Sequence, residues 1–220
     1  MKSIFFIDGL NMYHAIHKGF VHQKYKWLNL KDLAQNLIRK EDVLEKVMYF
    51  TAYSNWDKFK EKRHRMYVSA LSKYGVQPII GKFIPVTKKF NKKNNRIIST
   101  GPYYYEYSVI TDEITYATYE EKRTDVNIAT WIIDFAYQKK YEHAYVVTAD
   151  GDIAPAIEKV KQRFPKIKFT AVLPFGLKGK DICNACDDVI EITETDLQNA
   201  LFPRKIGKGK GVIVRPAAWA

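Results

Sequence analysis

The sequence has few cysteines, a shortage of acids and no long apolar run, and each shortage excludes a class of protein. Its two cysteines, Cys183 and Cys186, cannot form the disulfide framework of a small secreted domain. They lack the second pair of ligands of a zinc ribbon, so we interpret them as small buried side chains near a helix. No stretch approaches the ~18 apolar residues of a membrane span. Asp8 follows only four apolar residues, too few for a signal-peptide core, so we expect a cytoplasmic protein.

Basic residues outnumber acidic residues in this sequence. The chain has 36 Lys and Arg against 24 Asp and Glu, a net charge of +12 in 220 residues. Two stretches, 82–105 and 197–220, contain no acid. Such an excess favours nucleic acid or a membrane surface as partner, with solubility as the alternative role. The basic end carries few apolar anchors for a membrane, so nucleic acid is the favoured partner.

Strand-sized apolar runs alternate with helical patterns along most of the chain. The strands are predicted at 3–7, 46–53, 76–84, 143–148, 167–173 and 188–192. The helices are predicted from near Asn11 and at 29–40, 57–74, 124–138, 153–163 and 178–186. This alternation predicts an α/β fold whose mostly parallel sheet is covered by helices on both faces.

Residues 85–119 interrupt this alternation. Their basic and aromatic side chains include Lys88, Lys89, Lys92, Lys93, Arg96, Tyr103, Tyr104, Tyr105 and Tyr107. We predict an exposed basic hairpin or loop inserted into one domain that covers residues 1–196. Residues 197–220 are predicted to form a mobile basic tail.

Acids follow the predicted strands at two places. Asp8 comes after the first strand, and Asp150 and Asp152 come after the strand at 143–148. If the two strands are neighbours, these carboxylates share one crevice at the carboxyl ends of the sheet. Crowded carboxylates need a counter-cation, and Mg²⁺ or Mn²⁺ suits oxygen ligands. The alternative role for each acid is a turn or helix cap, and Asp125 in the first turn of its helix has the same alternative.

Other chemistries lack their motifs in this sequence. No glycine-rich run has the spacing of a dinucleotide-binding or phosphate-binding loop, and Gly176-x-x-Gly179-Lys180 is too short. No serine lies in a Gly-x-Ser-x-Gly elbow. An aspartyl-phosphate enzyme would use Asp8 with a second acid two residues later, where this chain has Leu10.

Three motifs together resemble one protein family. They are Phe6-Ile7-Asp8-Gly9-Leu10-Asn11, Glu121-Lys122-Arg123-Thr124-Asp125-Val126 and Val146-Val147-Thr148-Ala149-Asp150-Gly151-Asp152. Their order and spacing resemble those of NYN domains in the PIN-like nuclease superfamily, and of its bacterial LabA/DUF88 branch. The resemblance covers residues 3–192.

The resemblance implies a PIN-like, three-layer, Rossmann-like fold with five or six strands in its parallel sheet, and a metal-dependent ribonuclease activity. By position, the family's catalytic and metal-binding pocket corresponds to Asp8, Asp125, Asp150 and Asp152, with Asn11 as the motif's asparagine. Thr148 matches a hydroxyl position that steadies a carboxylate or contacts a phosphate. Trp131 stands where many members carry a further acid, so one metal ion is better supported than two. Asp134 lies about half a turn from Asp125 around the helix and is expected to face elsewhere.

These implications predict an endonuclease that hydrolyses RNA phosphodiesters with Mg²⁺ or Mn²⁺. Cations that offset the acidic pocket and tyrosines that stack unpaired bases would bind the substrate. These candidates are Thr148, Lys88, Lys89, Lys92, Lys93, Arg96, Tyr103 and Tyr105. A non-catalytic nucleic-acid-binding module and a metal-dependent phosphatase are the alternatives. RNA is favoured over DNA, and association into a homo-oligomer is left open.

Overall fold

A six-stranded parallel sheet forms the centre of the protein. The computed structural model describes residues 1–18, 20–91, 104–107 and 113–219 of the chain. The sheet has the order β3-β2-β1-β7-β8-β9, and every neighbouring pair is parallel. Its strands are β1 (Lys2–Asp8), β2 (Val43–Thr51), β3 (Val76–Ile80), β7 (His143–Val147), β8 (Lys168–Leu173) and β9 (Asp188–Glu191). The predicted α/β class and mostly parallel sheet are confirmed, with six strands.

The strand order reverses between β1 and β7. The chain moves outward from β1 through β2 to β3, and then returns to the other side of β1 as β7. Ile7 pairs with Val147, so the two strands end side by side. Such a switch point is where ligands bind in open α/β sheets.

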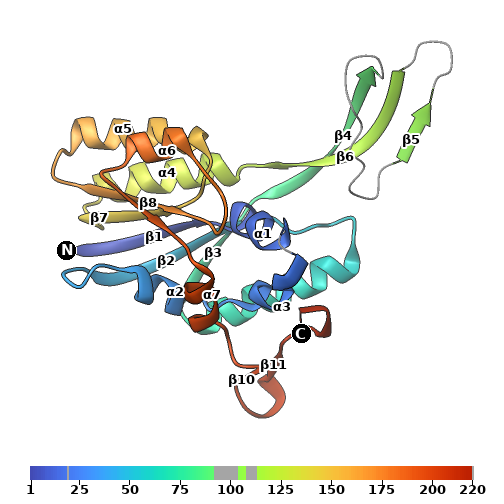
Figure 1. Cartoon of the computed structure of the whole chain (residues 1–220), viewed down its shortest axis with the longest axis horizontal. Helices are drawn as coiled ribbons and strands as arrows, with labels where there is room; N and C mark the ends of the chain where they lie inside the picture. Colours follow the sequence, from blue (N-terminus) through green and yellow to red (C-terminus); the bar gives the residue numbers. More distant parts are fainter. Residues whose placement is uncertain (19, 92–103, 108–112, 220) are drawn as a thin grey trace.

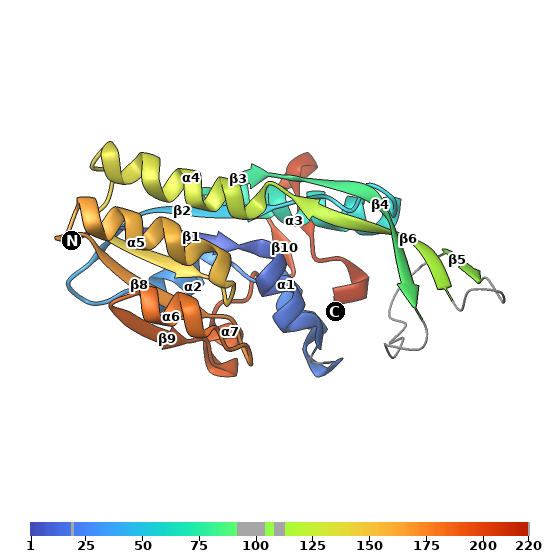
Figure 2. The same cartoon turned by 90° about the horizontal axis from the view of Figure 1, so that it is seen from above.

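Helices cover both faces of the sheet, which gives three layers (Figures 1 and 2). One face carries α1 (Gly9–Lys18), α2 (Leu30–Leu37), α3 (Lys58–Lys73), α7 (Glu194–Asn199) and the 3₁₀ segment η1 (Phe20–Trp27). The other carries α4 (Thr124–Tyr137), α5 (Ala154–Arg163) and α6 (Lys180–Ala185). Successive side chains of β1 alternate between the two cores: Phe5 and Ile7 enter the first, and Ile4 and Phe6 enter the second. Because both faces are buried, the strand is apolar at every one of these positions.

A three-stranded antiparallel sheet, which we call the arm, projects from the body (Figure 1). Its order is β4-β6-β5, with β4 (Lys82–Asn91), β6 (Glu113–Lys122) and β5 (Tyr104–Tyr107). It takes the place of the hairpin or loop insertion expected over 85–119. The strand predicted at 76–84 is divided at Gly81, where a side chain would lie 2.8 Å from Glu121 Oε1. The ring of Trp56 stacks on Tyr119 at 4.1 Å between centroids, which anchors the base of the arm.

The end of the chain is folded, so the expected mobile tail is wrong. After α7 it forms β10 (Lys205–Ile206), η3 (Gly209–Gly211), β11 (Ile213–Val214) and η4 (Ala217–Trp219). Trp219 is buried, and its ring lies 6.2 Å from that of Trp27 and 6.0 Å from that of Tyr67. The Trp27 Nε1–H donates to the carbonyl of Pro203 at 3.0 Å. The segment has no acids, but its buried Phe202, Ile206 and Trp219 bind it to the first core.

Smaller expectations also have clear outcomes. In the helix predicted at 57–74, Phe59 is 78% exposed because it lies in the first turn of α3, before the buried face that begins at Tyr67. Cys183 and Cys186 are half-buried free thiols that pack against the second core. Within the described part of the chain, no helix is long and apolar enough to cross a membrane.

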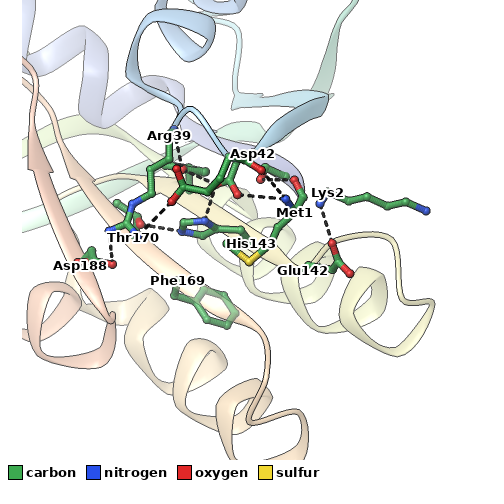
Figure 3. A network of polar contacts seen from close by, with 12 residues as sticks. Met1, Lys2, Arg39, Asp42, Glu142, His143, Phe169, Thr170 and Asp188 are labelled. Carbon is green, nitrogen blue, oxygen red and sulfur yellow. Dashed lines mark hydrogen bonds and ion pairs between the residues drawn. The ribbon is translucent and has the colours of Figure 1, made fainter.

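A buried polar network lies at the amino ends of the strands, opposite the switch point (Figure 3). Asp42 Oδ2 lies 2.6 Å from His143 Nδ1 and accepts from the Tyr145 hydroxyl at 2.7 Å. Burial tends to raise the pKa of Asp42, but the hydrogen bond from Tyr145 and the neighbouring His143 hold it below its usual value. Burial lowers the pKa of His143, so Asp42 is ionised beside a neutral imidazole whose Nε2 lies 2.8 Å from the Thr170 hydroxyl. The other carboxylate oxygen, Asp42 Oδ1, has no hydrogen-bond partner in the described residues and lies 3.4 Å from the terminal ammonium of Met1. The network ties the starts of β1, β7 and β8 together.

Candidate active site

Asp8 ends β1 and caps the helix that follows. Its Oδ1 accepts hydrogen bonds from the backbone N–H groups of Leu10 at 3.1 Å and Asn11 at 3.0 Å. Gly9 permits this sharp entry into α1, because a Cβ there would lie 2.5 Å from the ring of Tyr49 and 2.7 Å from the carbonyl oxygen of Phe50. The Asp8 side chain is buried, and the two hydrogen bonds to its Oδ1 fix its orientation.

Two side chains tie the end of β1 to the end of β7. The Thr148 hydroxyl donates to Asp8 Oδ2 at 3.1 Å and accepts from the backbone N–H of Asp150 at 3.1 Å. The Asn11 amide oxygen accepts from the backbone N–H of Ala149 at 3.1 Å. The structure thus brings together the first and third sequence motifs across the switch point.

The loop after β7 presents two further carboxylates. Asp150 Oδ1 accepts from the backbone N–H of Asp152 at 2.9 Å, and so caps the 3₁₀ turn η2 (Gly151–Ile153) that leads into α5. Asp152, which the sequence suggested as a cap for that helix, is instead exposed. It is the most solvent-accessible of the four predicted acids.

Asp125 lies in the first turn of α4. The turn before it has Arg123 in the left-handed region, with φ of 89°, a rare conformation for a residue with a side chain. Glu121 accepts hydrogen bonds from the Thr124 backbone N–H at 3.1 Å and from its hydroxyl at 2.6 Å. Thr124 is thus the first residue of the helix, and the N-cap is Arg123. This strained turn is what delivers Asp125 to the carboxyl edge of the sheet.

Burial and neighbouring negative charges raise the pKa values of Asp8 and Asp125. Burial raises the pKa of Asp8 to about 6, against its hydrogen bonds, and the charge of Asp125 adds to the rise. The pKa of Asp125 is also raised, first by burial and then by the charges of Asp150, Glu121 and Asp152. Close carboxylates with raised pKa values are typical of a site that binds a cation or moves a proton.

The donor chemistry of this cluster fits a hard divalent cation, since every candidate ligand atom is a carboxylate oxygen. In the described residues, however, no three His, Cys, Asp or Glu side chains converge closely enough to hold a metal ion as they stand. Asp8 is held on both oxygens and Asp150 on one. The acids of the cluster therefore interact electrostatically, but their side chains do not form a complete coordination shell for a metal ion.

Two further acids at this edge were not predicted as site residues. A Cβ on Gly151 would lie 3.1 Å from Asp181 Oδ2, so Asp181 in the first turn of α6 borders the loop of Asp150 and Asp152. Glu121 raises the pKa of Asp125. The sequence signal for Asp181 is an acid in the first turn of the helix after β8, the same position that Asp125 takes in α4.

The predicted substrate-binding residues divide into three groups. Thr148 lies in the cluster itself, as described above. Lys88 forms an ion pair of 2.6 Å with Glu120 on the neighbouring strand of the arm. Lys89 and Tyr105 belong to β4 and β5. Outside the described residues lie Lys92, Lys93, Arg96 and Tyr103.

Comparison with known proteins supports the fold and the family. A crystal structure of a protein of unknown function from Vibrio parahaemolyticus matches with a TM-score of 0.54 and 16% sequence identity, over 91% of this chain and 96% of that one. At this identity the match shows a shared fold. A search of curated proteins finds no match.

The model of the NYN domain matches residues 2–193, which include the whole parallel sheet and all four acids of the cluster. NYN domains are generally nucleases, and the parallel sheet flanked by helices seen here is consistent with their PIN-like fold. The chain therefore belongs to the NYN domain family.

Proposed function

We propose that this protein is a metal-dependent ribonuclease that cuts RNA internally, with residues 1–196 as its catalytic domain. The observation that carries the proposal is the gathering of Asp8, Asp125 and Asp150 from three separate strand–helix junctions. They are close enough that Asp125 raises the pKa of Asp8 and Asp150 raises the pKa of Asp125. Because β1 and β7 are parallel neighbours, the turns after them lie at one edge in any case, whereas Asp125 reaches this edge from the arm, through the left-handed turn at Arg123. Membership of a nuclease family supports the same conclusion.

Asp8, Asp125, Asp150 and Asp152 are the residues that we assign to Mg²⁺ or Mn²⁺. When bound, such an ion supplies Lewis acidity toward the phosphodiester and neutralises the cluster. Asp8 is held in place by Leu10, Asn11 and Thr148, so its carboxylate is a fixed point of the site. We assign Asn11 and Thr148 to positioning, because each joins the ends of β1 and β7.

The exposed Asp152 is our candidate for the base that accepts a proton from the attacking water. Its backbone N–H is held by Asp150, whereas its side chain faces solvent. A general base must reach water and the substrate together, which a buried carboxylate such as Asp8 cannot do.

The arm is our candidate for holding the RNA strand. It carries the acid-free stretch of the sequence, and its base lies at the carboxyl edge of the sheet (Figure 1). Lys88 is already paired with Glu120. The remaining candidates are Lys89, Lys92, Lys93, Arg96, Tyr103 and Tyr105.

A non-catalytic nucleic-acid-binding module is the second candidate function. It is favoured by one observation, namely that no three side chains of the described residues converge as a metal site. Both candidates predict binding of nucleic acid, and only the first predicts cleavage.

The test is cleavage of labelled RNA and single-stranded DNA in Mg²⁺, Mn²⁺ or EDTA. Wild type is compared with Asp8→Asn and Asp150→Asn, and with Asp134→Asn as the matched control. Asp134 is exposed on α4 and bonded to Gln138 at 2.7 Å, outside the cluster. We expect metal-dependent cutting of RNA that both cluster variants lose and the control keeps. Cutting that survives both substitutions would overturn the site, and salt-sensitive binding without cutting would support the binding module.

A further inference from the structure

Lys26 is a buried cation outside the acidic cluster. It lies at the end of η1, and the residue is 8% exposed. Its Nζ lies 3.1 Å from His17 Nδ1 and 4.8 Å from the centre of the Tyr13 ring. Tyr13 and His17 lie on α1, and their rings stack with centroids 5.5 Å apart. Both are exposed, so the two groups that contact the ammonium lie at the protein surface.

The charges around Lys26 have its own sign. Burial lowers its pKa to about 8, and the charges of Arg63 and Lys60 on α3 add to the shift. Lys60 has an acid of its own, Asp57 at 3.5 Å. Across the described ranges, no carboxylate lies within ion-pair distance of Lys26 or Arg63. A buried ammonium that experiences the positive charges of Arg63 and Lys60, with no anion to offset them, is costly unless a ligand supplies the negative charge.

The histidine does not supply that charge. Burial lowers the pKa of His17, and the neighbouring Lys26 lowers it further. The imidazole is therefore neutral, and its Nδ1 accepts a hydrogen bond from the ammonium. One Lys26 hydrogen is fixed in this way, while the other two remain for an incoming oxygen.

This cationic site lies beside the acidic cluster. Helix α1 starts directly after Asp8, and His17 is six residues beyond Asn11, about 9 Å along the helix. On the other side, His64 follows Arg63 and its Nε2 lies 3.1 Å from the hydroxyl of Thr51, the last residue of β2. Helices α1 and α3 begin where β1 and β2 end, so both start at the carboxyl edge of the sheet, and Arg63 lies in the second turn of α3 (Figure 1).

We propose that Lys26 and Arg63, with His17 and Tyr13 at the rim, bind a phosphate group of the nucleic-acid backbone close to the phosphodiester at the acidic cluster. An anion of this kind supplies the missing counter-charge and accepts from several donors at once. The naming of nucleic acid as its source rests on the proposed function, since inorganic phosphate has the same chemistry. The site also offsets the repulsion between an RNA strand and the acids of the cluster.

The test is equilibrium binding of a labelled single-stranded RNA in EDTA, where metal-dependent cleavage is absent. Lys26→Met keeps the length of the buried side chain and removes its charge. Lys24→Met is the matched control, because Lys24 is an exposed lysine of the same segment η1. We expect Lys26→Met to weaken binding about tenfold and to reduce the slope of log K against log salt by ~0.7, and Lys24→Met to change the affinity less than twofold.

A second arm separates the two sources of phosphate. The thermal unfolding of wild type, Lys26→Met and Lys24→Met is measured in inorganic phosphate and in chloride at equal ionic strength. The shift seen in Lys24→Met gives the general stabilisation by phosphate salts. Loss of RNA affinity in Lys26→Met supports the proposal. Equal RNA affinity in the Lys26 and Lys24 variants overturns it, and a phosphate effect alone would assign the site to the free anion instead.

Two further comparisons cover the case in which Lys26→Met does not fold and the case in which the proposed ribonuclease function is wrong. If Lys26→Met does not fold, Arg63→Met is compared with Lys62→Met, a neighbouring exposed position of α3, with the same expected contrast. Asp8→Asn should keep Lys26-dependent binding while losing cleavage. A protein that cuts no RNA but binds it through Lys26 would overturn the proposed ribonuclease and support this site, whereas one that cuts RNA without using Lys26 would do the reverse.

Discussion

The side-chain amide of Asn11 accepts a hydrogen bond from the backbone N–H of Ala149 at 3.1 Å, across 138 residues of sequence. This bond joins the first turn of α1 to the loop that carries Asp150 and Asp152. Thr148 makes a parallel connection to Asp8. The relative position of the acids therefore depends on two small polar side chains as well as on the pairing of β1 with β7.

Replacing Asn11 with alanine should loosen this connection. The N–H of Ala149 would lose its partner in a partly buried position, and we expect a loss of about 1–2 kcal/mol in the free energy of unfolding. The rate of RNA cleavage should fall by more than the loss of folded protein explains, because the start of α1 and the loop after β7 would no longer be joined by this bond. Urea unfolding and cleavage rates measure the two effects, with Asn36→Ala, on the exposed face of α2, as the control. Unchanged cleavage in Asn11→Ala would show that the bond does not position the acids.

Gly179 allows the loop before α6 to approach the loop after β7. A Cβ at this position would lie 2.6 Å from the carbonyl oxygen of Ala149, which is backbone and cannot rotate away. Gly179→Ala should cost about 1–3 kcal/mol and displace Asp150 and Asp181. Gly211→Ala is the control, since its Cβ would meet only the flexible end of Lys73 at 3.6 Å. Equal unfolding midpoints for the two variants would contradict this explanation.

Trp219 should hold the end of the chain on the helical layer. Its ring packs against those of Trp27 and Tyr67, so Trp219→Ala leaves a cavity in an aromatic cluster. We expect a loss of about 3–5 kcal/mol, measured by denaturant unfolding. Val214→Ala removes an exposed apolar side chain from the same segment and should change stability by less than 0.5 kcal/mol, roughly the usual limit for surface positions. If Trp219→Ala were as mild, the segment would not be part of the folded core.

The sequence predicts the parts of this molecule that depend on local pattern. The alternation of strands and helices and the acids at strand ends follow from periodicity and chain position, and these two features are enough to single out Asp8 and Asp150 as site candidates. The fold of the final segment does not follow, because Phe202 and Trp219 are separated by a stretch rich in lysine and glycine that has no apolar period. The cationic site around Lys26 is also hidden, because its members come from three elements that only tertiary packing brings together.

Asp8 should destabilise the protein at neutral pH. Its pKa is raised from 3.8 to about 6 by burial, so the folded state prefers the protonated form. For a raised pKa, the contribution of the group to stability is fully present below pH ~4 and is lost as the pH rises through about 6. Two pKa units correspond to about 3 kcal/mol, and this net shift already includes the opposing hydrogen bonds to the carboxylate.

Asp8→Asn removes this cost, since asparagine does not ionise and keeps an oxygen for the N–H groups of Leu10 and Asn11. In EDTA at pH 8 we expect the variant to be more stable than wild type by about 1–3 kcal/mol, and at pH 4 to show little difference. Mg²⁺ should raise the melting temperature of wild type and not that of the variant, because the cation offsets the same buried charge. Asp134→Asn should behave as wild type in all three conditions. A variant that is less stable than wild type at pH 8 would contradict the prediction, because it would mean that the hydrogen bonds to the Asp8 carboxylate outweigh the cost of burying its charge.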